Sequence, residues 1–141
     1  MMSTLRPDPD ALLDKIQRDQ AKQARGHLKI FFGACAGVGK TYAMLKAAHQ
    51  QQQQGIDVLA GIVETHGRSE TLEMLEGLAQ LAPKKIEYRG NSLSEFDLES
   101  ALSRKAQLVL VDELAHTNVP GSRHRKRWQD IEELLKAGIN V

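Results

Sequence analysis

A run of small residues followed by a lysine and a threonine could bind phosphate. In the segment FFGACAGVGKTYAML, an apolar stretch gives way to small residues, and Gly39, Lys40 and Thr41 stand before a helix-forming sequence. Small residues let backbone N–H groups point into a concavity that holds an anion. A lysine here reaches the β- and γ-phosphates of a nucleotide, and the following hydroxyl is a ligand for Mg²⁺. The segment therefore predicts a site for ATP and Mg²⁺.

The spacing fits the relaxed form of this phosphate-binding (Walker A) motif. Ala34 stands where the strict form has glycine, and Gly33 lies one residue too early. The alternative is a tight turn with an exposed lysine, but the flanking apolar run and helix favour a phosphate loop. Cys35 is expected to contact the nucleotide rather than do redox chemistry. The expected contact residues are Gly33, Ala34, Cys35, Ala36, Gly37, Val38, Gly39, Lys40 and Thr41.

A second acidic (Walker B) site follows the apolar run at residues 108–111. Asp112 comes directly after this predicted strand, at the edge where ligands of open α/β sheets collect. With Thr41, its carboxylate is expected to bind Mg²⁺ directly or through water. Glu113 is a candidate catalytic residue that orients a water for attack on the γ-phosphate, and a structural role is an equal alternative. The segment VETHGR ends another strand at this edge, and its candidate pocket residues are Glu64, His66 and Arg68.

The polar loop after Glu113 is long enough to be functional. Its basic cluster is interpreted as a solvated patch or a protein-docking surface, because the total charge is only +1 and aromatic residues are scarce. No nucleic-acid partner is therefore expected. His116 and His124 lack metal-ligand spacing and are expected to form hydrogen bonds. The basic cluster consists of Arg123, Arg125, Lys126 and Arg127.

The elements that must position these residues alternate between strand and helix. Strands are predicted at residues 28–32, 56–63, 86–88 and 108–111, with another beginning at 139. Helices are predicted at residues 40–54, 72–79, 98–102 and 128–135. Such alternation implies right-handed crossovers and a mostly parallel sheet with helices on both faces. The predicted fold is therefore α/β, with the three layers of a P-loop NTPase.

Local signals predict where several of these elements begin and end. Gly55 is expected to end the first of these helices and Pro83 the second. Ser92 and Glu95 have capping-box spacing before the third. The strand at 108–111 is expected to be central and buried on both faces. The apolar face of the last helix consists of Trp128, Ile131, Leu134 and Leu135.

The length of 141 residues and the composition favour one domain without a membrane-spanning segment. Residues 1–26 are polar and are expected to form a loosely attached helix after Asp8 and Pro9. Residues 27–141 are then the nucleotide-binding domain. The single cysteine excludes an internal disulfide and suits a reducing compartment.

Together these motifs resemble the N-terminal cytoplasmic domain of the Kdp-type potassium and turgor sensor histidine kinases. The resemblance covers nearly the whole chain, through LRPDPDALL, FFGACAGVGKTYAML, VETHGR, YRGNSLSEFDL and VDELAHTNVPGSRHRKRWQDIEELLKAGINV. It implies an ATP-binding regulatory domain that modulates the kinase and phosphatase balance of an inner-membrane sensor, whose response regulator controls a potassium-uptake ATPase. Arg125 stands where the family usually has proline, which affects only the expected geometry of the loop.

The resemblance also implies the partners. They are ATP, the remaining domains of the sensor kinase, its response regulator, and a second copy through the full-length kinase. The family's universal-stress-like domain, four membrane helices and catalytic kinase domains are absent from this sequence, so it is expected to be a soluble, cytoplasmic N-terminal piece. Weak ATP hydrolysis stays open. The alternative function is a stand-alone Mg²⁺-dependent P-loop ATPase or small-molecule kinase.

Overall fold

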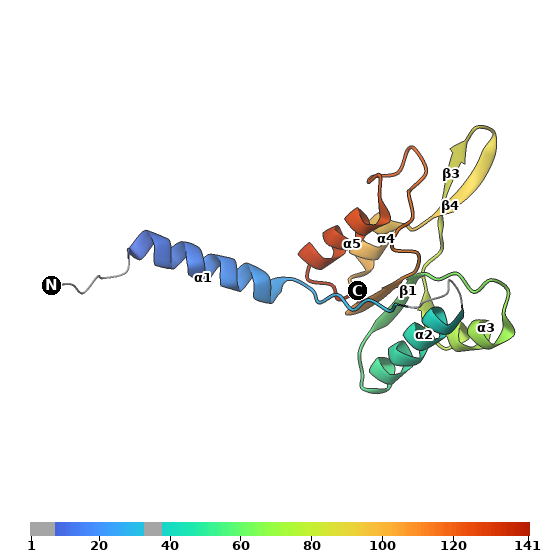
Figure 1. Cartoon of the computed structure of the whole chain (residues 1–141), viewed down its shortest axis with the longest axis horizontal. Coiled ribbons are helices and arrows are strands. Elements are labelled where there is room, and N and C mark those ends of the chain that lie inside the picture. Colours follow the sequence, from blue (N-terminus) through green and yellow to red (C-terminus); the bar gives the residue numbers. More distant parts are fainter. Residues whose placement is uncertain (1–7, 33–37) are drawn as a thin grey trace.

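The computed structural model describes residues 8–32 and 38–141 of the chain. In chain order the elements are α1 (Pro9–Ala24), α2 (Val38–Gln53), β1 (Val58–Ile62), α3 (Ser69–Glu76), β2 (Ala79–Gln80), β3 (Lys84–Tyr88), β4 (Asn91–Glu95), α4 (Leu98–Arg104), β5 (Leu108–Val111) and α5 (Arg127–Lys136). Helix α1 projects away from the other elements, with Leu12, Leu13 and Ile16 exposed (Figure 1). No described helix is long and apolar enough to cross a membrane.

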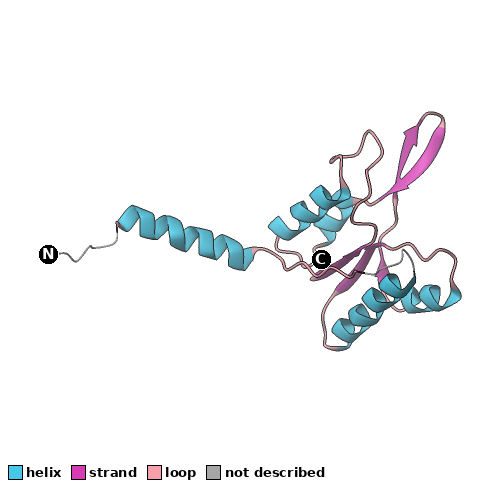
Figure 2. Ribbon diagram, in the orientation of Figure 1, coloured by secondary structure: helices cyan, strands magenta, loops and turns pink. Residues whose placement is uncertain are grey.

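The main sheet is parallel, with β1 between β2 and β5 (Figure 2). Beyond β5, Asn140 forms an isolated parallel bridge to Leu108, so the strand predicted to begin at 139 is present as one bridged residue and not as a full strand. The strand predicted at 28–32 is not formed as such. Its first part is extended chain, held by backbone hydrogen bonds of 3.0 Å between Val141 and both His27 and Lys29. Both of these bonds are made to the same residue, Val141, and the structure assigns no strand to residues 28–32.

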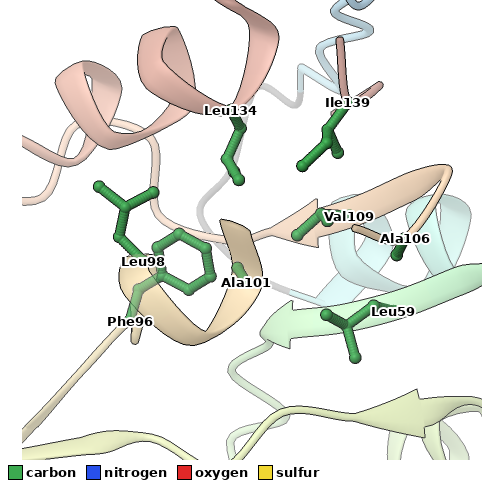
Figure 3. Packing of buried hydrophobic residues seen from close by; sticks show 8 residues of the cluster. All are labelled: Leu59, Phe96, Leu98, Ala101, Ala106, Val109, Leu134 and Ile139. Atoms are coloured by element: carbon green, nitrogen blue, oxygen red, sulfur yellow. The ribbon is translucent and has the colours of Figure 1, made fainter. Parts of the chain in front are cut away.

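Helices cover both faces of the parallel sheet. Because side chains alternate along a strand, Val109 faces a core with α4 and α5, whereas Leu110 faces a core with α2. The first core consists of Leu59, Phe96, Leu98, Ala101, Ala106, Val109, Leu134 and Ile139 (Figure 3). Each fully buried leucine contributes about 1.5–3 kcal/mol. The mostly parallel α/β architecture predicted from the sequence is confirmed.

The helix predicted at 72–79 ends earlier than expected. Helix α3 stops at Glu76, and Ala79 with Gln80 forms the edge strand β2 beside β1. Gly77, not Pro83, follows the last helical residue, and its Cα lies against the His49 ring, so that an added Cβ would meet His49 Cε1 at 2.7 Å. At Gly77 the end of α3 packs closely against α2, and the chain then enters strand β2. Helical periodicity cannot predict this end of α3, because the contact joins residues that are far apart in the sequence.

The predicted strand at 86–88 forms part of β3, but it pairs with β4 in a separate antiparallel hairpin. The capping box predicted from Ser92 and Glu95 is therefore wrong, since both residues belong to β4. Arg89 and Gly90 form the turn with φ values of 52° and 79°, the left-handed pair that a tight hairpin requires. Helix α4 is capped instead by Asp97, whose Oδ1 accepts the Ser100 N–H at 3.1 Å.

Helix α5 has the predicted apolar face, except that Arg127 is buried in place of Trp128. Ile131, Leu134 and Leu135 are buried, while Trp128 is 50% exposed. Arg127 is buried instead, at 2% exposure. Residues on a helix are about 100° apart, so the face centred on Ile131 and Leu134 includes Arg127 and leaves Trp128 at its margin.

Gly61 permits close packing between β1 and its neighbours. A Cβ there would lie 2.7 Å from Phe96 Cε1, 2.8 Å from Val109 Cγ1 and 3.0 Å from the Leu110 carbonyl oxygen. We expect Gly61→Ala to lower the free energy of unfolding by about 1–3 kcal/mol, as overpacked cores do. Urea denaturation measures this change. Gly39→Ala is the control, because no described atom lies within 4 Å of its added Cβ; an equal loss in both variants would contradict the packing argument.

Candidate functional site

Asp112 lies directly after β5, and its carboxylate accepts hydrogen bonds from α2, from the loop after β1 and from its own loop. Its Oδ2 accepts hydrogen bonds from the Thr41 hydroxyl at 3.3 Å and from the Glu64 N–H at 3.0 Å. Its Oδ1 accepts the Glu113 N–H at 3.0 Å. Thr41 belongs to α2, and Glu64 follows β1, so the carboxylate is fixed where the two central strands end beside a helix N-terminus. The structure thus brings together the acidic residue and the threonine that the sequence analysis assigned to one site.

Thr41 and Lys40 lie in the first turn of α2. Thr41 is 6% exposed, and Lys40 is partly exposed and lines a cavity with it. The first N–H groups of a helix have no intrahelical acceptor, and the helix dipole favours negative charge there. Val38 and Gly39 begin the same helix. The other predicted phosphate contacts, Gly33, Ala34, Cys35, Ala36 and Gly37, lie outside the described residues.

The Thr41 hydroxyl and the Asp112 carboxylate form an oxygen pair that fits Mg²⁺. Hard cations prefer such oxygens, and Mg²⁺ keeps several waters besides one or two protein ligands. Among residues 8–32 and 38–141, no group of three or more His, Cys, Asp or Glu side chains is arranged to hold a metal. The two oxygens could serve as protein ligands of a magnesium ion whose other ligands are waters.

Glu113 has an unusual backbone conformation beside this pair. Its φ of 59° lies in the left-handed region, which is uncommon for a residue other than glycine and is frequent at functional sites. Its side chain is exposed, and the residue lines the same cavity as Lys40 and Thr41. This position is compatible with the predicted role in orienting water.

Of the three predicted pocket residues in the VETHGR segment, Glu64 contacts Asp112, and it does so through its backbone. Glu64 meets it through the backbone N–H, and the Glu64 side chain is exposed. His66 forms a turn with φ 52°, and Arg68 immediately precedes α3. In the described part of the chain, none of these three residues lines the cavity beside Lys40.

A buried ion pair supports the backbone of Asp112, and the sequence analysis missed it. Arg127 Nη1 donates to the Asp112 carbonyl oxygen at 3.0 Å, and Arg127 Nη2 donates to Glu95 Oε2 at 3.2 Å. Glu95 is 3% exposed and also accepts from His116 Nε2 at 2.8 Å and from the Val119 N–H at 3.3 Å. The available signal was the helical spacing of Arg127 from Ile131, which places it on the buried face of α5.

Arg127 is therefore not part of a solvated or protein-docking basic surface, as the sequence had suggested, because it is buried and paired with Glu95. Of the other members, Arg123 pairs with Glu133 at 2.7 Å, and Arg125 is exposed. The hydrogen bonds predicted for the two loop histidines are confirmed, since His116 contacts Glu95 and His124 contacts Glu133, both at 2.8 Å.

Asp130 is a buried carboxyl beneath the same loop. Burial raises the pKa of Asp130, while a 3.0 Å hydrogen bond from Asn118 and the nearby charges of His124 and Arg127 oppose the rise. An acid with a raised folded-state pKa favours the folded state when protonated. Its stabilising contribution is therefore complete below its unfolded pKa and is lost as pH rises through the folded pKa.

We expect Asp130→Asn to remove this loss of stability above about pH 4, the usual pKa of an aspartate. Urea denaturation across pH measures it, and the variant should gain stability relative to wild type as pH rises. Asp57→Asn is a control of opposite sign. The Arg104 side-chain hydrogen bond lowers the pKa of exposed Asp57, so its contribution is present above the unfolded pKa and is lost as pH falls. Parallel pH profiles for Asp130→Asn and wild type would contradict the assignment.

The comparisons with known proteins agree with one another. Residues 24–141 match the family model for the KdpD osmosensitive K⁺ channel His kinase sensor domain. The chain is 62% identical to the sensor protein KdpD of Escherichia coli over 137 residues, and 54% identical to that of Clostridium acetobutylicum over 136 residues. These alignments cover 97% and 96% of this chain but only 15% of either relative. The chain therefore belongs to the KdpD family of sensor proteins, as an osmosensitive K⁺ channel His kinase sensor domain.

Proposed function

We propose that this chain is an ATP-binding regulatory domain with a P-loop NTPase-like fold. In a two-component potassium and osmotic sensor kinase, it modulates the balance of kinase and phosphatase activities and so the expression of a potassium-uptake ATPase. Its own partners are Mg-ATP and the remaining domains of the kinase, which acts on a response regulator. The domain lies on the cytoplasmic side of the membrane sensor.

One observation carries the proposal. The Thr41 hydroxyl, in the first turn of α2, lies 3.3 Å from the Asp112 carboxylate at the end of β5, and Lys40 stands beside them. A hydroxyl, a carboxylate and a lysine at a helix N-terminus are the side chains that bind a magnesium-phosphate group. Membership of a family of sensor proteins supports a regulatory role for such binding.

Calorimetric titration of the chain with ATP tests the proposal. We expect millimolar or better affinity with Mg²⁺, and weaker binding when EDTA removes the metal. AMP is the control, because it lacks the β- and γ-phosphates that Lys40 is assigned to contact. Equal affinity for AMP and Mg-ATP, or no ATP binding at millimolar concentration, would overturn the assignment.

A stand-alone Mg²⁺-dependent ATPase or small-molecule kinase is the second candidate. The observation that favours it is Glu113, which is held in a left-handed conformation next to Asp112. Such backbone conformations cost about 1–3 kcal/mol and cluster at active sites. In a domain that only binds ATP, Glu113 would have no catalytic role, so the activity of a Glu113 variant distinguishes the two candidates.

Glu113→Gln separates the two candidates. We expect nucleotide affinity to change little, because Glu113 is assigned to face water rather than phosphate. If the chain is an ATPase, phosphate release should fall about 100-fold, within the range attributed to a positioned general base. Glu64→Gln is the matched control, since Glu64 contacts Asp112 through its backbone only. Unchanged turnover in Glu113→Gln would contradict a catalytic role for this residue.

A further inference from the structure

Arg127 is a buried charge on a firmly packed helix. It is the first residue of α5, and Leu134 of the same helix packs in the core shown in Figure 3. The arginine is 2% exposed and bonded to Glu95, the last residue of β4. Apolar residues in place of a buried ion pair often leave a fold equally stable, because burying the two charges costs free energy. Stability alone is therefore a weak reason for an arginine at this position.

The second contact of Arg127 fixes the peptide between Asp112 and Glu113. Arg127 Nη1 donates to the Asp112 carbonyl oxygen at 3.0 Å, and the Asp112 N–H donates to the Ile62 carbonyl oxygen at 2.9 Å. A trans peptide is planar, so its carbonyl and the N–H that follows lie in one plane and point in opposite directions. Because Arg127 holds the Asp112 carbonyl, it also sets the direction of the Glu113 N–H.

The Glu113 N–H in turn holds the carboxylate of the candidate site. It donates to Asp112 Oδ1 at 3.0 Å, while Oδ2 accepts the Thr41 hydroxyl at 3.3 Å. The φ of 59° at Glu113 belongs to a conformation that persists only where neighbouring groups hold it. Arg127 holds the peptide before Glu113, and the His116 N–H holds the Glu113 carbonyl at 3.0 Å. A single peptide plane therefore connects Arg127 with the Asp112 carboxylate.

We propose that Arg127 is a positioning residue for the Mg-ATP site. By fixing the peptide between Asp112 and Glu113, it keeps the Asp112 carboxylate beside Thr41 and holds Glu113 in its left-handed conformation. Glu95 keeps the guanidinium in place for this role. The inference rests on the proposed function for its ligand, but the orientation of Asp112 is a property of the free protein and can be measured without nucleotide.

The alternative is that Arg127 only stabilises the fold. Both roles predict that a variant unfolds more easily. Only positioning predicts a local change at the two amides that donate to the Asp112 carboxylate, those of Glu64 and Glu113. Only positioning also predicts that the variant loses the part of the ATP affinity that depends on Mg²⁺.

The first test measures amide hydrogen exchange of Arg127→Lys without nucleotide. Lysine keeps a positive charge opposite Glu95, but it lacks the planar fork through which arginine reaches two acceptors in fixed directions. We expect the Glu64 and Glu113 amides to exchange about 2- to 10-fold faster than in wild type, because their hydrogen bonds to the carboxylate weaken. Exchange followed by NMR resolves the two amides.

Ile139→Val is the control for a general loss of stability. Ile139 belongs to the core, and its neighbour Asn140 pairs with Leu108, at the end of β5 opposite to Asp112. The smaller side chain leaves a cavity and destabilises the fold. Exchange at Glu64 and Glu113 should nevertheless stay at the wild-type rate, because the contacts of Asp112 are intact.

The second test compares ATP affinity with Mg²⁺ and with EDTA by calorimetric titration. We expect the ratio of the two affinities to fall about tenfold in Arg127→Lys, as happens when groups that orient a metal ligand are replaced. The affinity in EDTA should change little, because Arg127 does not touch the phosphates. Ile139→Val should keep the wild-type ratio.

Glu95→Gln is a second variant, which decides the question if Arg127→Lys does not fold. Glutamine keeps the shape of the side chain but removes the charge that holds Arg127, so both measurements should change in the same direction. Unchanged amide exchange or an unchanged Mg²⁺ ratio in the folded variants would overturn the proposal, and so would equal changes in Ile139→Val. If wild type does not bind Mg-ATP, the proposed function fails, and amide exchange still decides whether Arg127 positions Asp112.

Discussion

Lys40→Met is expected to lower the affinity for Mg-ATP about tenfold or more. Lys40 lies in the first turn of α2 and lines the cavity that holds Thr41 and Asp112. A hydrogen bond to a charged group contributes about 1.5–3 kcal/mol, and each 1.4 kcal/mol corresponds to about a factor of ten in affinity. Methionine keeps the length and helix propensity of the side chain, so the loss reports the charge. Calorimetric titration with and without Mg²⁺ measures it.

Lys46→Met is the matched control for this measurement. Lys46 lies on the same helix and is exposed, but it is six residues further from the helix N-terminus, about 9 Å along the axis. Its replacement removes the same charge from the protein without touching the proposed phosphate site. If both variants lose affinity equally, Lys40 acts through general electrostatics, and the phosphate-loop interpretation fails.

Glu95→Ala is expected to lower the free energy of unfolding by about 3–5 kcal/mol, the usual cost of removing one partner of a buried ion pair. Glu95 and Arg127 are 3% and 2% exposed, so the variant leaves a guanidinium buried without its carboxylate. The whole stability of a domain is about 5–15 kcal/mol, so this is a large part of it. Urea denaturation monitored by circular dichroism measures the change.

Glu99→Ala serves as the exposed counterpart. Glu99 pairs with Lys84 at 3.7 Å, and both side chains are more than 40% exposed. Exposed pairs contribute about 0–1 kcal/mol, because water screens them. A loss for Glu95→Ala that is no larger than for Glu99→Ala would show that the buried pair does not stabilise the fold.

Much of the parallel α/β architecture could be predicted from local pattern. The run at Leu108–Val111 and the helical sequence before Gly55 carry their own signals, apolar content in one and helix formers ended by glycine in the other. The pairing of Thr41 with Asp112 also followed, since the ends of parallel strands and the start of a helix meet at one edge. These features depend on residues near one another in the chain or on general rules of connection.

What the sequence did not predict depends on contacts between distant residues. Ser92 and Glu95 have the spacing of a helix cap, but pairing with β3 made them a strand. Arg127 looked like one member of a solvated cluster until Glu95, 32 residues away, supplied its buried partner.

The sequence alone determined which residues are candidates for binding a magnesium nucleotide and in what order helices and strands alternate, because side-chain chemistry and periodicity are local properties. Only the tertiary structure decided how Asp112 is held. Its carboxylate accepts N–H groups from two loops, and its carbonyl accepts the guanidinium of Arg127. It also decided that Asn140 and Val141 lie between β5 and the chain at His27 and Lys29. Apart from the bond between the neighbours Asp112 and Glu113, these hydrogen bonds join residues far apart in the chain, so they form only when the elements come together and no local pattern predicts them.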